Sequence, residues 1–230
     1  MSTSHDMSIP KPIVISIEGS IGGGKTTLLE QLRQEHPEWH FIDEPLDTWT
    51  SLKNESGENL LQVFYKDIRR WSYTFQNCAI LSRAQNIKRA VDDWRAECEL
   101  NPDARRHNIF ITERCLDTDF NVFAQMLRDD GMLDGIEWDL YKKWYRMLEN
   151  WVTISGLVYV DTPPEVCSQR IKYRAREGEE TISDEYLKRL DVYQRRWIDH
   201  TSLQVLRYNN SDHTATMNTP ADVERFVRKL

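Results

Sequence analysis

A glycine-rich segment near the start of the chain constrains the fold more than any other feature. An apolar, β-branched run, Ile13–Ile17, leads into the glycines, and a helix-forming sequence, Leu28–Arg33, follows them. In such a P-loop, backbone N–H groups surround a polyphosphate, a lysine contacts its β and γ oxygens, and a hydroxyl holds Mg²⁺. The flanking strand and helix disfavour a chance glycine turn. We expect the phosphate-binding residues to be Gly19, Ser20, Ile21, Gly22, Gly23, Gly24, Lys25, Thr26 and Thr27.

The length and composition of the chain indicate one globular domain. At 230 residues it can bury one substantial core, and no linker or repeat divides it. We expect a disordered tail over 1–11 and a single domain over 12–230. No apolar run approaches the roughly 20 residues of a membrane helix, so we expect no membrane association. The formal net charge of −7 argues against nucleic acid as a partner, because that binding depends on clustered lysine and arginine.

The cysteines and the first residues predict a cytoplasmic protein. The four cysteines are scattered and form no CxxC pair, which favours reduced thiols over disulfides or zinc ligands. Residues 1–11 lack both the apolar core of a secretory signal and the arginine-rich pattern of a transit peptide.

Apolar runs alternate with helical sequences along the rest of the chain. We expect strands at 13–17, 39–43, 108–112, 156–160 and 203–208, with loops at 51–61 and 100–107. We expect helices at 28–33, at 60–99 with an interruption near 66–67, and at 119–127, 136–150, from 165, 183–200 and 221–230. The alternation predicts an α/β, P-loop NTPase-type three-layer fold: a five-stranded parallel sheet with helices on both faces.

Acidic residues follow two of the expected strands at their carboxyl ends, where open α/β sheets bind ligands. Glu44 precedes Pro45, which favours an extended backbone at Glu44, and Glu113-Arg114 follows the strand at 108–112. An acid placed there can bind Mg²⁺, and a neighbouring arginine can stabilise phosphoryl charge. The alternatives are a surface acid before a turn and a structural ion pair. The P-loop favours the functional interpretation of both.

One face of the long helical stretch carries polar and aromatic side chains where a structural face would carry aliphatic ones. The residues share a stripe of a helix with about 3.6 residues per turn. Such a stripe suits a planar ring with hydrogen-bonding edges, and a partly solvated face is the alternative. The stripe consists of Phe75, Gln76, Ala79 and Arg83.

Two later helices carry a basic and an aromatic cluster. Arg170 and Arg174 share a helix face beside a loop, so they could close over bound ATP as a lid near 170–183. A solvated, salt-bridged helix end is the alternative. Aromatic stripes are more often core than binding sites. We therefore interpret one set as packing residues of the core or of a subunit interface: Trp138, Tyr141, Trp144, Tyr145, Leu148 and Trp151.

Together, these motifs resemble those of the deoxynucleoside kinase family. The resemblance runs in order from about residue 12 to 200 and fades beyond that point, and it is far more specific than a P-loop alone. It implies ATP-dependent 5′-phosphorylation of a deoxyribonucleoside in nucleotide salvage, with Mg²⁺ as cofactor and a homodimer as the expected assembly. The motifs are Ile17–Lys25, Glu44-Pro45 with Trp49, Tyr65, Arg70–Gln76, Leu81–Arg83, Glu113-Arg114 and Arg170–Glu179.

The resemblance implies roles around the transferred phosphoryl group. Glu44 would be the general base on the 5′-hydroxyl, and Arg114 would steady that centre. Thr26 and Glu113 would serve Mg²⁺. The catalytic set would be Glu44, Arg114 and Lys25, and the lid arginines on the phosphates would be Arg170, Arg174 and Arg176.

The resemblance also implies how the nucleoside is held. Tyr65 and Glu179 match the pair on the 3′-hydroxyl, and Gln76 matches the residue that hydrogen-bonds the base. Gly178 departs from the family, in which an acid occupies this position, and the departure leaves the register of the lid open. The expected substrate-binding residues are Glu44, Trp49, Tyr65, Phe75, Gln76, Ala79, Arg83, Arg114, Asp119, Phe123 and Glu179.

The choice of base depends on a trio that resembles the one in deoxycytidine and purine deoxynucleoside kinases. These residues are Ala79, Arg83 and Asp119, with Asp117 as a nearby alternative to Asp119. An arginine–aspartate pair would hydrogen-bond the polar edge of adenine, guanine or cytosine and crowd the thymine methyl group. We therefore expect thymidine to be disfavoured.

Two other functions remain open from the sequence. A nucleoside monophosphate kinase of the thymidylate type would need extra cations for the acceptor's phosphate, which the Glu44 carboxylate would repel. A non-catalytic relative acting as an assembly subunit would not need an intact Lys25, Glu44 and Glu113. Phosphorylation assays with four deoxynucleosides discriminate among the three.

Overall fold

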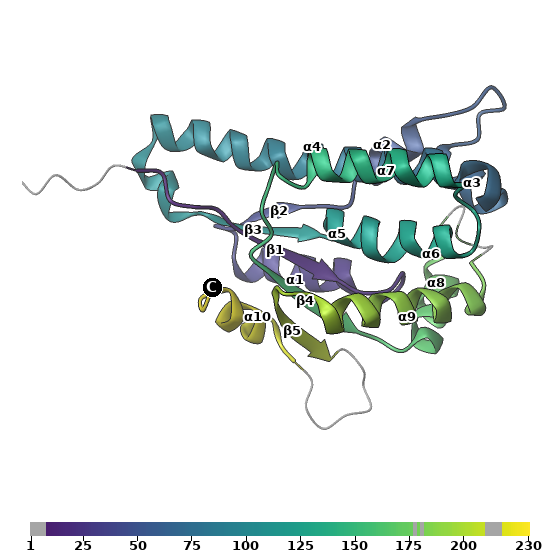
Figure 1. The fold of residues 1–230 in the computed structure, drawn as a ribbon. Coiled ribbons are helices and arrows are strands. Elements are labelled where there is room, and N and C mark those ends of the chain that lie inside the picture. Colours follow the sequence, from purple (N-terminus) through teal and green to yellow (C-terminus); the bar gives the residue numbers. More distant parts are fainter. Residues whose placement is uncertain (1–7, 177–178, 180–181, 210–217) are drawn as a thin grey trace, which may run out of the picture.

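The protein is described by a computed structural model that covers residues 8–176, 179, 182–209 and 218–230. Its centre is a five-stranded sheet in which every neighbouring pair of strands is parallel, in the order β2-β3-β1-β4-β5 (Figure 1). The predicted α/β fold with a five-stranded parallel sheet is confirmed. The strands are β1 (Ile13–Glu18), β2 (His40–Ile42), β3 (Ile109–Glu113), β4 (Gly156–Asp161) and β5 (Gln204–Asn209).

Helices cover both faces of the sheet because alternate residues of each strand point to opposite sides. Ile15 and Ile17 of β1 pack in one cluster with α1 and α10, whereas Val14 packs on the other face with α4. The described helices are α1 (Lys25–Glu35), α2 (Leu46–Ser51), α3 (Leu60–Lys66), α4 (Ile68–Leu100), α5 (Leu116–Thr118), α6 (Gln125–Asp129), α7 (Gly135–Leu148), α8 (Pro164–Arg174), α9 (Asp184–His200) and α10 (Pro220–Val227).

The expected break in the long helical stretch lies at Asp67, between α3 and α4. Its side chain accepts a hydrogen bond from the Arg70 N–H, so it caps α4 at the point where α3 ends. The loop expected at 100–107 contains a 3₁₀ turn, η1 (Pro102–Arg106), because Pro102 stands at its first position and the Asn101 side chain accepts from Asp103.

The helix expected at 119–127 is longer and irregular. A π-helical segment, η2 (Asp119–Ala124), joins α5 to α6, and π-helical turns occur frequently at functional sites. Periodicity in the sequence did not indicate this change of helical type.

The aromatic helix α7 divides into an inner and an outer face. Tyr141 and Leu148 are buried in the core, while Trp144 is 46% exposed. In Figure 1, α7 runs alongside α4, and the two helices are in contact. Only the inner face therefore has a partner within the described part of the chain.

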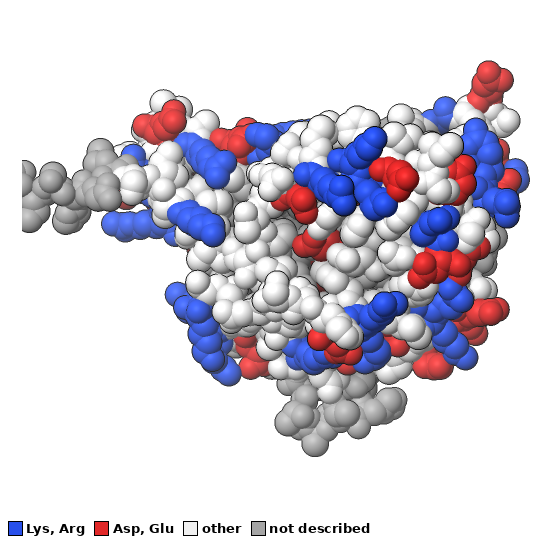
Figure 2. Space-filling view, viewed as in Figure 1, with Lys and Arg blue, Asp and Glu red and all other residues white. Residues whose placement is uncertain are grey.

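The N-terminal segment, the surface charge and the length of the helices complete the description of the fold. Residues 1–7 of the expected tail lie outside the described residues, whereas Ile9 packs against the cluster around Val14. Acidic and basic side chains alternate around the face shown in Figure 2, with mostly uncharged surface between them. Among the helices of the described ranges, none is long and apolar enough to cross a membrane.

Candidate active site

The P-loop folds tightly between β1 and α1 and packs against β4 and α8. Gly19 and Gly22 have positive φ angles of 147° and 73°. A Cβ atom would lie 2.8 Å from the Val160 carbonyl oxygen at Gly19 and 2.7 Å from the Cys167 carbonyl oxygen at Gly22. Both positions therefore require glycine in this conformation. Gly24 is the N-cap of α1, so the loop ends at the positive end of a helix.

Lys25 is buried at the first position of α1. Its Nζ donates to the Ser20 carbonyl oxygen at 2.9 Å and lies 3.6 Å from Glu113 Oε1. Burial, and then the positive charge of Arg114, lower its pKa to about 8. An anionic phosphate at this place would restore the charged form of the lysine.

Thr26 and Glu113 meet across the sheet edge, as expected for a shared ligand. The Thr26 hydroxyl donates to Glu113 Oε2 at 2.9 Å. A hydroxyl and a carboxylate are oxygen ligands of the kind Mg²⁺ prefers, usually completed by water and substrate phosphates. The two residues are therefore suited to hold that ion.

Glu44 follows β2 and lies between two buried arginines. Arg114 Nη1 donates to Glu44 Oε1 at 2.5 Å, and Arg83 Nη2 lies 3.6 Å from the same oxygen. Burial works to raise the pKa of Glu44, but Arg114, Arg83 and Lys25 outweigh it and hold the pKa at about 2. The carboxylate is therefore ionised at neutral pH.

Arg114 adopts an unusual backbone conformation directly after β3. Its φ of 65° is in the left-handed region, which is uncommon for a residue other than glycine. The Thr112 hydroxyl donates to the Arg114 carbonyl oxygen at 3.0 Å, and the Arg114 N–H donates to the Ile17 carbonyl oxygen at 3.1 Å. The guanidinium consequently reaches back to Glu44 and to the Gly19 carbonyl oxygen, 3.3 Å away.

Glu18 is a further buried acid, beneath the P-loop, that the sequence had suggested only as part of the motif. The Ser16 hydroxyl donates to its Oε1 at 2.5 Å, while Oε2 has no partner in the described part of the chain. Burial raises its pKa, which favours the neutral form of this carboxyl group.

The expected base-binding stripe of α4 faces the same pocket. Arg83 is 2% exposed, and its Nε donates to Asp119 Oδ2 at 2.9 Å. Its Nη1 donates to the Glu113 carbonyl oxygen at 2.6 Å, so the guanidinium is held from two sides. Gln76 is buried about two turns earlier on α4, and its Oε1 has no partner among the described residues. That oxygen is free to accept a hydrogen bond from a ligand.

Aromatic rings surround this polar floor. Trp49 and Phe75 meet edge to face with centroids 5.2 Å apart, and Trp49 Nε1 donates to the Ser82 hydroxyl at 3.1 Å. On the opposite side, the Arg114 guanidinium lies 5.1 Å from the centroid of Phe123. All three rings line one cavity, where they could contact a flat ligand.

The arginines of the expected lid contact either the P-loop or Glu179. Arg170 Nη1 donates to the Gly23 carbonyl oxygen at 3.2 Å. Arg174 and Arg176 donate to the two carboxylate oxygens of Glu179 at 2.6 and 3.3 Å. Glu179 is also among the charges that raise the pKa of the Tyr65 hydroxyl, after burial and Tyr186. Gly178 lies outside the described residues.

These residues line one cavity of about 260 Å³ at the carboxyl ends of the strands. Gly19 and Ser20 are the two expected site residues that do not line it: Gly19 packs against Val160 of β4, and Ser20 is buried. Leu46 and Leu61 also line the cavity, and the sequence did not predict them, since nothing in the sequence distinguishes an apolar residue that lines a site from one that packs in the core. The residues brought together are Ile21, Gly22, Gly23, Gly24, Lys25, Thr26, Thr27, Glu44, Trp49, Tyr65, Phe75, Gln76, Ala79, Arg83, Glu113, Arg114, Asp119, Phe123, Arg170, Arg174, Arg176 and Glu179.

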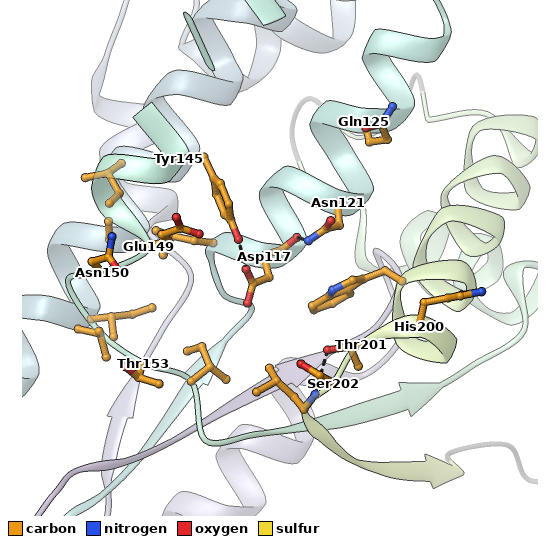
Figure 3. Close-up of a pocket in the computed structure, with 18 of the residues that line it drawn as sticks. Asp117, Asn121, Gln125, Tyr145, Glu149, Asn150, Thr153, His200, Thr201 and Ser202 are labelled. Atoms are coloured by element: carbon orange, nitrogen blue, oxygen red, sulfur yellow. Dashed lines mark hydrogen bonds between the residues drawn. The ribbon is translucent and has the colours of Figure 1, made fainter. Parts of the chain in front are cut away.

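A larger cavity, of about 1100 Å³, lies on the other side of the α5–α6 segment (Figure 3). Asp117 points into it and accepts a hydrogen bond from the Tyr145 hydroxyl, while Asn121 follows on the same side. Thr201 and its neighbours border the opposite side. Of the two aspartates considered for the base site, Asp119 therefore faces Arg83 and Asp117 faces away.

Comparisons with known proteins agree with this geometry. A family model described as deoxynucleoside kinase matches residues 15–230, so the similarity continues past residue 200, where we expected it to fade. Deoxycytidine kinase 2 of Gallus gallus is 33% identical over 207 residues, which cover 83% of this chain and 76% of the relative.

Two further relatives have similar coverage. Mitochondrial deoxyguanosine kinase of Xenopus laevis is 30% identical over 219 residues, covering 89% of this chain and 79% of the relative. Deoxycytidine kinase of Homo sapiens is 31% identical over 206 residues, which cover 83% of this chain and 76% of the relative. The chain belongs to the deoxynucleoside kinase family.

Proposed function

We propose that this protein transfers the γ-phosphoryl group of ATP to the 5′-hydroxyl of a deoxyribonucleoside in nucleotide salvage. The observation that carries the proposal is the position of Glu44. Its carboxylate lies in one cavity with the P-loop on one side and the Arg83–Asp119 floor on the other. A hydroxyl group bound there would meet a base and a phosphoryl donor together.

Glu44 and Arg114 are the groups suited to the acceptor. The Glu44 carboxylate can accept the proton of the 5′-hydroxyl as that oxygen attacks phosphorus. Its low pKa makes it a weak base in the ground state, so proton transfer would be late, when the attacking oxygen has become acidic. Arg114, bonded to Glu44, keeps the carboxylate in place and adds positive charge where negative charge develops.

The donor side depends on the P-loop, Thr26 and Glu113. Loop N–H groups and Lys25 would hold the β and γ phosphates of ATP. Mg²⁺, when bound, would neutralise phosphate charge, and Thr26 and Glu113 would hold it. Arg170 already contacts the loop, and Arg174 and Arg176 are the further lid groups for the phosphates.

The sugar and base would lie toward α4. Tyr65 and Glu179 would hold the 3′-hydroxyl, and Gln76 would hydrogen-bond the base between Phe75 and Phe123. The Arg83–Asp119 pair favours adenine, guanine or cytosine, because it offers both a donor and an acceptor to the polar edge of these bases and would crowd the methyl group of thymine. We therefore propose that deoxycytidine or purine deoxynucleosides are preferred to thymidine.

We further propose a homodimer formed through the outer face of α7. Its exposed apolar residues recur every three or four positions, so they form one continuous stripe on the helix. Leu81 of the neighbouring helix α4 is 41% exposed as well. A second copy of the chain is the expected occupant, since a helix face buries itself well against its own symmetric equivalent. The stripe consists of Ile136, Leu140, Trp144 and Met147, which are 74, 42, 46 and 49% exposed.

The four cysteines are unpaired, and Cys98, Cys115 and Cys167 are buried. Free thiols of this kind fit a reducing compartment, and we propose the cytoplasm. A thymidylate-type kinase is disfavoured because Glu44 would repel the phosphate of a monophosphate acceptor.

The proposal is tested by steady-state assays with Mg²⁺·ATP as donor and five acceptors: deoxyadenosine, deoxyguanosine, deoxycytidine, thymidine and thymidine monophosphate. We expect transfer to at least one of the first three with a higher kcat/KM than to thymidine. Turnover of thymidine monophosphate alone would contradict the proposal. No turnover with any of the five acceptors would favour a non-catalytic relative.

A further inference from the structure

Thr162 follows β4 directly and carries a buried hydroxyl group that the proposed mechanism does not use. Its side chain is 2% exposed, and its Oγ1 donates to the Gly23 carbonyl oxygen at 2.8 Å. The bond joins segments 139 positions apart in the chain, because β4 pairs with β1, the strand that leads into the P-loop (Figure 1). Thr162 does not line the substrate cavity. The hydroxyl therefore contacts the loop from the protein interior and not from the cavity.

The Gly23 carbonyl belongs to the least restricted part of the loop. Gly22, Gly23 and Gly24 are consecutive, and glycine has more conformational freedom to lose on folding than any other residue. The peptide group between Gly23 and Gly24 can therefore turn more easily than a peptide group between residues with side chains. Within the loop, the Gly23 N–H donates to the Ser20 carbonyl oxygen at 3.1 Å, which fixes the preceding peptide group. The direction of the Gly23 carbonyl depends on contacts from outside the loop.

Arg170 of α8 donates to the same carbonyl oxygen, but it is a less permanent partner than Thr162. Its Nη1 lies 3.2 Å from the Gly23 oxygen, and its side chain also lines the cavity. As a phosphate ligand of the lid, the Arg170 guanidinium would turn toward ATP when ATP binds. The Thr162 side chain is short and buried, so its bond to Gly23 can persist when the cavity is filled.

The direction of the Gly23 carbonyl determines the direction of the Gly24 N–H. The peptide group between them is trans, and the C=O and N–H of a planar trans peptide point to opposite sides. Because the carbonyl points to Thr162 in the interior, the Gly24 N–H points away from the interior, and Gly24 lines the cavity. Backbone N–H groups in such loops bind phosphate oxygens. A peptide turned the other way would present its carbonyl oxygen to the phosphates and repel them.

We propose that Thr162 is a positioning residue for ATP: its hydroxyl holds the Gly23–Gly24 peptide so that the Gly24 N–H is directed at the phosphates. A donor that is already oriented needs no reorganisation when the ligand binds, which strengthens binding. Thr162 thereby raises the affinity for ATP without touching ATP. The inference rests on the proposed function only in that the loop must hold ATP, and it is the same for any acceptor.

The test replaces Thr162 by valine, which has a similar shape but carries a methyl group in place of the hydroxyl. We expect Thr162→Val to raise the KM for ATP, and the Kd of Mg²⁺·ATP measured by calorimetry, roughly 10-fold, the scale for a buried acceptor that loses its donor. The KM for the nucleoside should stay within about twofold, since other elements hold the base and the sugar. An unchanged Kd for Mg²⁺·ATP would overturn the proposal.

Thr162→Ser separates the hydroxyl from the rest of the side chain. Serine keeps the hydroxyl and lacks the methyl group, so the Kd of Mg²⁺·ATP should stay within about threefold of the wild type. A loss equal to that of the valine variant would assign the effect to packing of the side chain and overturn the proposal. Thermal unfolding, measured alongside, should show that both variants are folded at the temperature of the binding experiment.

Thr50→Val is the matched control. The Thr50 hydroxyl donates to the Leu46 carbonyl oxygen within α2 at 2.9 Å, so the same substitution removes the same kind of hydrogen bond outside the P-loop. We expect the Kd of Mg²⁺·ATP to match that of the wild type within about twofold. An equal loss in this variant would show that the effect does not depend on the Gly23 carbonyl, and would overturn the proposal.

Calorimetry also separates this inference from the proposed function. If the wild type binds Mg²⁺·ATP but phosphorylates no deoxynucleoside, the proposed function fails, while the Kd values of the variants still decide the role of Thr162. If deoxynucleosides are phosphorylated and Thr162→Val binds Mg²⁺·ATP as the wild type does, the inference alone fails. A wild type that binds no Mg²⁺·ATP would overturn both, because the loop would then hold no phosphate.

Discussion

The two ends of the substrate cavity are built in different ways. The phosphate end consists mainly of one continuous segment, Ile21–Thr27, whose backbone packs against β4 and α8 through the P-loop glycines. The base end consists of side chains from α4 and η2, and its central pair, Arg83 and Asp119, is separated by 36 positions in the chain. Backbone groups bind any nucleotide phosphate alike, whereas side-chain pairs distinguish one base from another. Changes at the first end should therefore affect turnover of every substrate, and changes at the second should affect the choice among them.

The largest expected effect is at the phosphate end. Lys25→Ala should lower kcat/KM for Mg²⁺·ATP by roughly 10³-fold or more, because the lysine neutralises the transferring phosphates. The activity of the variant should fall by the same factor with every nucleoside acceptor. Calorimetry should show nucleoside binding within about twofold of the wild type, since Lys25 is remote from the base. Retained activity would exclude this loop as the donor site, and unequal losses would break the distinction between the two ends.

Glu44→Gln should have the next largest effect, since Glu44 lies at the junction of the two ends. We expect kcat to fall roughly 10²-fold, the usual scale for a general base, with binding of ATP and nucleoside nearly intact. The amide keeps the shape of the carboxylate but cannot accept the proton. Single-turnover measurements separate the chemical step from product release. A kcat within a few-fold of the wild type would remove Glu44 from the mechanism.

At the base end, a double change should alter preference more than rate. Arg83→Met with Asp119→Ala replaces the polar floor by an apolar one, so kcat/KM for thymidine relative to deoxycytidine should rise at least about 10-fold. Steady-state assays with both nucleosides measure the ratio. If the wild type already uses thymidine as well as the other three, the floor is wrongly assigned, although the kinase activity would stand.

The single variant Asp119→Ala is the control for that experiment. It leaves the buried Arg83 guanidinium without its main partner, and breaking a buried pair costs about 3 kcal/mol or more. The double variant removes both charges, so we expect it to be more stable than the single one. Urea unfolding compares them. Equal stability would indicate that Glu44 and the Glu113 carbonyl suffice to hold Arg83.

The sequence predicted the phosphate end from local pattern alone. The spacing of the glycines, Lys25 and Thr26 is enough to predict the conformation of the loop, because that conformation depends only on the loop's own backbone and on the strand and helix that flank it. The placement of Glu44 and Glu113 also followed, since parallel strands bring their carboxyl ends to one edge. The left-handed backbone of Arg114 could not be foreseen, because long-range contacts impose it.

The base end was predictable only through resemblance to a family. Helical spacing grouped Gln76 and Arg83, but nothing local indicated that Asp119 rather than Asp117 would face them. The two aspartates are two positions apart and point to opposite sides of the helical segment, so only its packing against α4 decides which of them faces Arg83. The change to π-helix in this segment also leaves no clear signal in a pattern of apolar residues. The 3₁₀ turn η1 was missed in the expected loop for a similar reason: Pro102 starts a helical turn as readily as it ends one.

The smallest expected effect is a dependence on pH that also separates the two ends. Burial and Arg114 lower the pKa of Lys25 to about 8, so the free enzyme loses the lysine's charge as the pH rises through that value. We expect kcat/KM for ATP to fall a few-fold between about pH 7 and pH 8.5, while kcat at saturating ATP stays level because bound phosphate restores the charge.

Glu44, with a pKa of about 2, stays ionised throughout and should produce no acid limb above about pH 5. The ratio of deoxycytidine to thymidine turnover should not change over this range, since Arg83 keeps its charge. Initial-rate profiles at limiting and saturating ATP measure all three quantities. If the ratio of deoxycytidine to thymidine turnover changed with pH in parallel with kcat/KM for ATP, the two ends of the cavity would be coupled and not independent.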